Sequence, residues 1–202
     1  MIAIVDYGVG NLFSLESSFA AIGADVVITA DPAVLRSADK LLLPGVGAFE
    51  DAAGKLRSTG LGAVVKELAT AGKPLLGICL GMQLLFDKSY EYGCHEGLGL
   101  IPGTVRPIAD VIPRGLKIPH IGWNALRFHQ YSPLFAQVNQ GDCVYFVHSF
   151  YAADCESDTV ATAEYGAHLT AAVARGNVYG CQFHPEKSGS VGLKILKAFA
   201  EL

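Results

Sequence analysis

Short apolar runs alternate with helical patterns through the first half of the chain. Four of these runs are too short for helices and predict buried strands: residues 2–6, 26–28, 41–43 and 73–76. Spacing and capping signals predict helices between them: residues 12–22 before the stop signal Gly23, a short helix opened by Asp31-Pro32, and a stretch after Gly47 to about Ala71 that is broken near Gly60. Fully apolar strands that alternate with helices are typical of a parallel sheet covered on both faces.

The pattern changes after Tyr92, where Gly and Pro become frequent and apolar residues alternate with polar ones. Four further segments are predicted as strands, antiparallel in part: Val144–Phe150, Thr159–Ala163, Thr170–Ala174 and Val178–Phe183. The chain ends in a predicted helix, with Ser188 as its cap and an apolar stripe of Leu193, Leu196 and Phe199. No repeat or linker divides the sequence, so residues 1–202 are expected to form a single domain.

Composition excludes several classes of protein. With 51% hydrophobic residues the chain has enough material for a sizeable core, and a net charge of −4 without a Lys/Arg cluster argues against nucleic acid as a partner. The longest apolar stretch, Pro74–Phe86, is interrupted and too short to span a bilayer, so no membrane association is expected. The N-terminus lacks a basic leader, and five cysteines form no disulfide framework. These features predict a protein of the reducing cytoplasm.

One stretch carries the strongest chemical signal, Gly77-Ile78-Cys79-Leu80-Gly81. It joins a predicted strand to a run, Met82–Phe86, that indicates the first turns of a helix, which is the form of a nucleophile elbow. The two glycines are required because side chains there would collide with the neighbouring strand and helix. A thiol at Cys79 would lie at a helix N-terminus, which favours the thiolate, and the N–H of Leu80 could stabilise an oxyanion. A buried structural cysteine in a turn fits this stretch, taken alone, equally well.

A cysteine nucleophile needs a base and a group that orients the base. His184-Pro185-Glu186 offers both, because residues two apart in an extended segment project to the same side. His95, His120 and His148 are competing bases, although each lacks an acid two residues further on. Cys181-x-x-His184 could form half of a metal site, but no second pair matches it, and no metal is expected.

Two other glycine-rich turns also follow predicted strands. Asp6–Asn11 follows the first strand and Pro44–Gly47 the third, while Cys79 follows the fourth. In a parallel sheet the chemistry lies at the carboxyl ends of the strands, so the three segments are expected to share one rim. An ordinary turn would explain Pro44–Gly47; in a functional interpretation its backbone, at Val46 or Gly47, donates a second N–H to the oxyanion.

Taken together, the elbow around Cys79, the later His184-Pro185-Glu186 and the upstream Pro44–Gly47 resemble the class I glutamine amidotransferases. Four segments are similar in particular to the glutaminase subunits of imidazole glycerol phosphate synthases: residues 6–11, 119–124, 145–149 and 184–188. The resemblance covers essentially the whole chain and implies a three-layer α/β/α sandwich. One departure is Phe150, where the family often has tyrosine, so a contact through that hydroxyl is not expected here.

The resemblance implies hydrolysis of L-glutamine to glutamate and ammonia without a cofactor. Cys79 would attack the carboxamide, His184 would protonate the departing ammonia, and Glu186 would orient His184. Water would then hydrolyse the glutamyl thioester. The amino-acid end of glutamine would be held by Gln83 and by backbone at Gly47, Ser149 and Phe150.

The resemblance also implies a partner. Ammonia would pass to a cyclase subunit, a (β/α)₈ barrel, in a heterodimer that serves histidine biosynthesis. The residues it implies at the partner surface are Asn11, Trp123, Asn124, Tyr145 and Lys187. Burial statistics alone favour a core position for a lone tryptophan, whereas the resemblance predicts that Trp123 is exposed in the isolated chain.

Two alternatives stay open on the sequence. A glutaminase of another synthase would share the three motifs, but the glutaminases of pyridoxal phosphate synthase and anthranilate synthase have other N-terminal motifs in place of Asp6–Asn11. A non-enzymatic redox-sensing or chaperone-like α/β protein could carry an elbow cysteine, but His184-Pro185-Glu186 argues against it.

Overall fold

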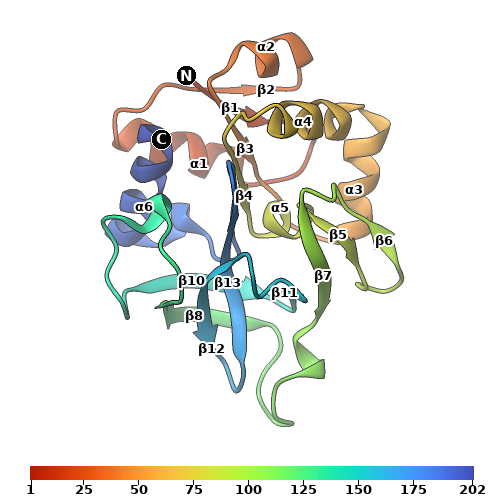
Figure 1. The fold of residues 1–202 in the computed structure, drawn as a ribbon, viewed down its shortest axis with the longest axis vertical. Coiled ribbons are helices and arrows are strands. Elements are labelled where there is room, and N and C mark those ends of the chain that lie inside the picture. Colours follow the sequence, from red (N-terminus) through yellow and green to blue (C-terminus); the bar gives the residue numbers. More distant parts are fainter.

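The computed structural model describes residues 1–202 and is built around a sheet of eight strands in the order β2-β1-β3-β4-β14-β13-β12-β9 (Figure 1). Its strands are β1 (Ile2–Val5), β2 (Val26–Thr29), β3 (Lys40–Leu43), β4 (Leu75–Ile78), β9 (Arg127–Phe128), β12 (Thr159–Glu164), β13 (His168–Arg175) and β14 (Val178–Cys181). The strands from β2 to β14 run parallel, and β13, β12 and β9 are antiparallel to their neighbours. The predicted mostly parallel sheet with a partly antiparallel C-terminal half is confirmed.

The sheet is covered on both faces by helices, which confirms the three layers. The helices are α1 (Leu12–Ala21), α2 (Pro32–Ser37), α3 (Phe49–Ser58), α4 (Leu61–Thr70), α5 (Leu80–Gln83) and α6 (Gly189–Glu201). In Figure 1, α1 and α6 lie to the left of β1, β3 and β4, and α3 and α4 to the right. Side chains of β1 alternate between the two cores: Ile4 packs with Phe19 and Phe199 on one side, and Val5 with Phe49 on the other.

The local signals at the helix ends act as predicted. The Asp31 side chain accepts a hydrogen bond from the Ala33 N–H at 2.8 Å, so it caps α2. Gly23 has φ +72° just after α1, and Gly60 has φ +73° between α3 and α4. A left-handed backbone at these positions is cheap only for glycine, which explains why each helix stops there.

Two smaller sheets occupy the region where the sequence pattern is weak. One pairs β8 (His120–Ala125) with β10 (Cys143–His148), and the other has the order β11-β7-β5-β6. The strands of the second sheet are β5 (Phe86–Ser89), β6 (His95–Glu96), β7 (Ile101–Pro107) and β11 (Phe150–Ala153). The prediction of one strand over Val144–Phe150 is therefore wrong, because the chain passes from one sheet to the other at Ser149.

Two further predictions need correction. The helix after the elbow ends at Gln83, because the carbonyls of Leu84 and Leu85 pair with the N–H groups of Leu98 and Leu100, both at 2.8 Å, and the chain then enters β5. Ser188 precedes α6 but its hydroxyl does not cap it. That hydroxyl donates instead to the carbonyl of His184 at 2.6 Å.

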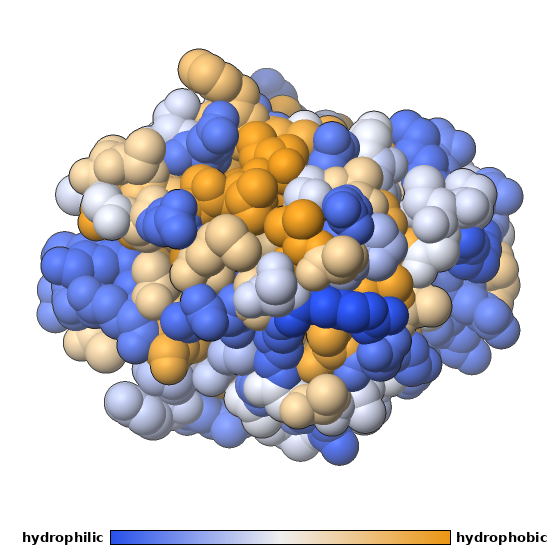
Figure 2. Space-filling view, turned by 90° about the horizontal axis from the view of Figure 1, so that it is seen from above, coloured by the Kyte–Doolittle hydropathy of each residue, from blue (hydrophilic) through white to orange (hydrophobic).

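One edge of the sheet is β2, a short strand whose four residues are all half-buried. Seen from above, from the end that carries β2 and α2 in Figure 1, the surface shows a patch of apolar side chains ringed by polar ones (Figure 2). None of the helices combines the length and the apolar character that crossing a membrane requires.

Candidate active site

Cys79 lies at the sharp turn between β4 and α5. Its backbone has φ +55°, a left-handed conformation that costs energy for a residue with a side chain. A Cβ at Gly77 would come 2.7 Å from the carbonyl oxygen of Gly81, and a Cβ at Gly81 would overlap the carbonyl oxygen of Leu43. The prediction that only glycine fits on both sides of Cys79 is confirmed.

His184 and Glu186 face each other beside the end of β14. The imidazole Nδ1 lies 2.8 Å from the carboxylate Oε1, and the two side chains are only 4% and 1% exposed. The segment is not extended as expected, because Pro185 starts a 3₁₀ turn over Pro185–Lys187. The turn is fixed by the Ser188 hydroxyl, so the pair forms through a turn rather than through strand alternation.

The electrostatics of this pair favour a charged imidazole. Burial lowers the pKa of His184, but hydrogen bonds to Cys79 and Glu186 and the negative charges of both outweigh burial and raise the pKa to about 10. The raised pKa favours the imidazolium form at neutral pH, beside the Glu186 carboxylate. This arrangement can hold a thiolate and deliver a proton to a leaving group.

The glycine-rich turns meet at the same rim, as predicted. The Tyr7 hydroxyl donates to the carbonyl oxygen of Pro44 at 2.6 Å, and the Leu80 N–H donates to the carbonyl oxygen of Gly45 at 3.3 Å. A Cβ at Gly45 would lie 2.6 Å from the backbone nitrogen of Gly81, so the loop packs directly on the elbow. In this conformer the Leu80 N–H is hydrogen-bonded to the Gly45 carbonyl and is not free to stabilise an oxyanion.

A cavity of about 340 Å³ opens in front of Cys79. Its lining includes Cys79, all four residues expected to bind glutamine, and one acid that was not expected. The four are Gly47, Gln83, Ser149 and Phe150, and the acid is Glu91. The Gln83 amide nitrogen donates to the Phe150 carbonyl at 3.2 Å and to the Gln182 side-chain oxygen at 3.0 Å. Gln83 can therefore offer a ligand its carbonyl oxygen, an acceptor that suits an ammonium group.

Two residues of the site were missed in the sequence. Glu91 lines the cavity and accepts the Phe49 N–H at 2.6 Å through one oxygen, at the N-terminus of α3. Gln182 is fully buried and points its amide nitrogen at the Cys79 sulfur, 3.8 Å away. Gln182 lies two residues before His184, so its closeness to the His184-Pro185-Glu186 motif was a signal in the sequence. No motif near Glu91 indicates a role for that residue.

The competing bases are not available for that role. His120 and His148 hydrogen-bond to each other at 3.0 Å, and burial lowers the pKa of His148 to about 3. His95 lies on β6 with its Nδ1 3.9 Å from Glu50, and it is not part of the lining of the cavity in front of Cys79. No group of three or more His, Cys, Asp or Glu side chains is placed to hold a metal ion.

The residues expected at a partner surface divide into two sets. Trp123 is 57% exposed, and its ring lies 6.3 Å from that of Tyr145 on the paired strand. Lys187 is also exposed. It lies close to Tyr145, because the Tyr145 N–H donates to the hydroxyl of the next residue, Ser188. Asn11, by contrast, is half-buried at the start of α1.

Asn124 follows Trp123 on β8, so its side chain projects to the opposite face of the strand. Its amide nitrogen binds the Glu164 carbonyl at 2.7 Å, and its amide oxygen accepts the Ala125 N–H at 2.8 Å. The structure therefore does not bring Asn124 to the surface that carries Trp123.

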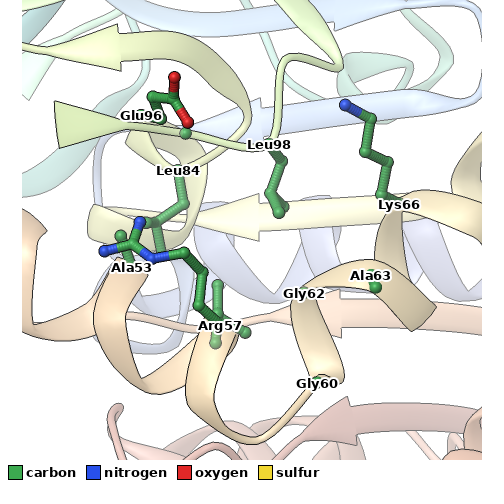
Figure 3. A pocket seen from close by; sticks show the side chains of 11 residues that line it. Ala53, Arg57, Gly60, Gly62, Ala63, Lys66, Leu84, Glu96 and Leu98 are labelled. Atoms are coloured by element: carbon green, nitrogen blue, oxygen red, sulfur yellow. The ribbon is translucent and has the colours of Figure 1, made fainter.

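Other cavities lack this chemistry. One of about 290 Å³ lies between α3, α4 and the turn after β6, with the charged side chains of Arg57, Lys66 and Glu96 around an apolar floor (Figure 3). Another of about 540 Å³ lies against β11, β12 and β13. Neither contains a residue of the Cys79, His184 and Glu186 set, so the cavity at the rim is the candidate active site.

Comparisons with known proteins show the family of the chain. The family model described as "Glutamine amidotransferase class-I" matches residues 3–201. Imidazole glycerol phosphate synthase subunit HisH of Geobacillus sp. (strain WCH70) is 50% identical, over 100% of this chain and 97% of its own length. The HisH subunit of Caldanaerobacter subterraneus subsp. tengcongensis is 49% identical over 100% of this chain and 98% of its own.

Solved structures agree on the fold. A crystal structure of a glutamine amidotransferase has a TM-score of 0.77 at 17% identity, covering 99% of this chain and 97% of its own. The structure of PurLQS from Thermotoga maritima has a TM-score of 0.75 at 20% identity, again covering 99% and 97%. At this identity the likeness concerns the fold alone.

The chain therefore belongs to the class I glutamine amidotransferases. Within that class it falls in the family of the HisH subunits of imidazole glycerol phosphate synthase, the glutaminase subunits of histidine biosynthesis. The designation of these relatives as subunits implies a partner synthase subunit.

Proposed function

We propose that Cys79, His184 and Glu186 are the catalytic residues of glutamine hydrolysis. The observation that carries this proposal is the buried His184–Glu186 pair, 2.8 Å apart, whose imidazolium is stabilised by Cys79. The Cys79 thiolate attacks the side-chain carbonyl of glutamine, and the tetrahedral intermediate collapses as His184 gives its proton to the departing ammonia. His184 then takes a proton from water, which attacks the thioester and releases glutamate.

Substrate binding is assigned to the cavity in front of Cys79. The Gln83 carbonyl oxygen and the free carboxylate oxygen of Glu91 are acceptors for the ammonium group of glutamine, and backbone at Gly47, Ser149 and Phe150 holds its amino-acid end. The oxyanion receives the N–H of Leu80 and one from the loop, at Val46 or Gly47, after the loop has released Leu80.

The proposed partner is a cyclase subunit with a (β/α)₈ barrel, which receives the ammonia in a heterodimer. Trp123, Tyr145 and Lys187 form its docking surface. Asn11, at the start of α1, is a further residue proposed to contact the partner. Residues 1–202 act as a single domain. The family match, which runs from residue 3 to 201, supports this proposal. Five free cysteines fit a cytoplasmic protein.

His184→Ala is expected to lower glutamine hydrolysis by about 10²- to 10⁴-fold, the contribution of a positioned acid and base. Glu186→Gln is expected to be milder, because a neutral amide can still accept the Nδ1–H while the charge that raises the pKa of His184 is lost. The imidazolium persists below a pKa of about 10 in the unmodified protein. The alkaline limb of kcat/KM should therefore move to lower pH in Glu186→Gln, which a pH profile of glutamate release measures. Equal losses in both variants would contradict the orienting role of Glu186.

Trp123→Ala is expected to weaken assembly with the synthase subunit by about 2 kcal/mol or more, as for aromatic residues at the centre of interfaces. The fold should be unaffected, because the side chain is 57% exposed. Isothermal titration with the synthase subunit measures the affinity, and thermal unfolding measures the stability. Tyr131→Ala, at an exposed tyrosine outside the proposed surface, is the control. Unchanged affinity in Trp123→Ala would place the interface elsewhere.

A further inference from the structure

Two buried histidines form a hydrogen bond across paired strands, and one of them, His148, is part of the lining of the glutamine cavity. His120 of β8 is 3% exposed and His148 of β10 is 6% exposed. The two residues are directly opposite each other in the antiparallel pair, with His120 Nδ1 3.0 Å from His148 Nε2. The His120 ring is also stacked between Phe146 and Tyr165, at centroid distances of 4.9 and 4.3 Å.

The position of every proton in this pair follows from the groups at its two ends. At one end His148 Nδ1 lies 2.8 Å from the carbonyl oxygen of Phe150, which can only accept, so Nδ1 carries the proton. A neutral His148 then has a lone pair on Nε2, and His120 must donate to it from Nδ1.

The hydrogen bonds at the His120 end of the pair lead independently to the same proton positions. The Asn124 amide nitrogen lies 3.3 Å from His120 Nε2. The orientation of that amide is fixed, because its oxygen accepts the Ala125 N–H and its nitrogen donates to the Glu164 carbonyl. The nitrogen therefore donates to His120 as well, which leaves the His120 proton on Nδ1. Both rings are neutral and in the Nδ1–H form.

The Phe150 carbonyl joins this chain to the active site. It accepts two hydrogen bonds, one from His148 and one from the Gln83 amide at 3.2 Å. Gln83 also binds Gln182, whose amide nitrogen faces the Cys79 sulfur. Since both nitrogens of His148 are engaged, the ring has none left to exchange a proton with a substrate.

We propose that His120 and His148 are positioning residues of glutamine binding, which hold the Phe150 carbonyl and through it Gln83 in the geometry that receives the amino-acid end of the substrate. The proposal rests on the proposed function of the cavity. Asn124 belongs to the same unit, as the donor that sets the proton order of both rings. Loss of the hydrogen bond from His120 would leave His148 Nε2 unpaired in the interior and free His148 to turn away from Phe150.

Two variants at position 120 separate the hydrogen bond from the packing. His120→Asn places an amide nitrogen near the position of Nδ1, so a donor to His148 remains while the stacked ring is lost. His120→Phe keeps a ring between Phe146 and Tyr165 but has no donor. The assay measures glutamate release by the complex with the synthase subunit, as kcat and KM for glutamine.

His120→Phe is expected to raise KM about tenfold and to change kcat by less than about threefold, the effect of leaving one buried acceptor unpaired. His120→Asn is expected to keep KM within about threefold of the unmodified chain, since the donor is preserved. The opposite order would show that the ring serves packing alone, and equal KM values in both variants would likewise overturn the proposal. An unmodified chain without glutaminase activity would instead contradict the proposed function of the whole site.

The unmodified chain provides a test that does not depend on activity or on variants folding. Nitrogen-15 NMR of the histidine rings distinguishes Nδ1–H from Nε2–H, and the His120→Asn spectrum assigns the His120 signals. Both His120 and His148 are expected in the neutral Nδ1–H form. An Nε2–H signal from either ring would overturn the proton order on which the proposal depends.

Discussion

Cys79→Ala is expected to abolish glutamine-dependent synthesis by the complex, while synthesis from added ammonium salts continues at the unmodified rate. Under the proposed function only the release of ammonia needs the thiolate, and we expect the synthase subunit to use ammonia whatever its source. The expected loss is about 10⁶-fold, as for removal of a nucleophile from a triad. The measurement is product formation by the reconstituted complex with glutamine and, separately, with ammonium.

Cys143→Ala is the matched control for this experiment. Cys143 is also a free cysteine, but it is exposed on β10, its thiol faces the Gly141 carbonyl, and it does not line the cavity in front of Cys79. Its loss should leave both reactions unchanged. Glutamine-dependent turnover that survived in Cys79→Ala would show that another group is the nucleophile.

The second large effect concerns the partner. The isolated chain is expected to hydrolyse glutamine about 100- to 1,000-fold more slowly than the complex with the synthase subunit, the effect of one missing oxyanion donor. In the structure the Leu80 N–H is taken by the Gly45 carbonyl, so the oxyanion site is incomplete in this conformer. Glutamate release at saturating glutamine, with and without the synthase subunit, measures the ratio. Full activity of the isolated chain would contradict this gating without affecting the triad.

Gly47 allows the loop to be tested directly. Its φ of +91° is unfavourable for any residue with a side chain, and a Cβ there would meet no atom within 4 Å. Gly47→Ala should therefore destabilise the observed conformer without a collision and raise the basal rate of the isolated chain. Gly72→Ala is the control, because Gly72 has φ +99°, equally open space and no place at the rim. Equal basal rates in both variants would mean that this conformer does not limit catalysis.

The parallel half of the sheet could be predicted from the sequence because its strands are apolar on both faces. Leu41, Leu42 and Leu43 pack alternately into the two cores, so no polar position interrupts the run. The glycine requirement at the elbow was equally visible in the sequence, and a Cβ at Gly77 or Gly81 would indeed collide with backbone atoms.

The strands between residues 86 and 107 could not be predicted in the same way. Leu84 and Leu85 continue the apolar run of α5, and only their pairing with the distant Leu98 and Leu100 ends the helix. Long-range pairing of this kind leaves no local signal, so tertiary contacts overrode the helical pattern.

Side-chain networks were hidden for a related reason. His120 and His148 meet only because β8 and β10 pair, although they are 28 residues apart in the chain. Glu91 reaches the cavity from a turn with no motif of its own. Motifs therefore indicated the residues of the proposed triad, while the residues proposed to position the substrate emerged only from the folded chain.

Covalent labelling of Cys79 tests the central claim most directly. A chloroketone analogue of glutamine places an electrophilic carbon where the carboxamide would lie, and the thiolate displaces chloride to form a stable thioether. Peptide mass spectrometry of the complex is expected to find the label on Cys79 alone among the five cysteines, with glutamine suppressing it and His184→Ala slowing it. Labelling that ignored glutamine, or that fell on another cysteine, would contradict the assignment of Cys79 as the nucleophile that attacks glutamine.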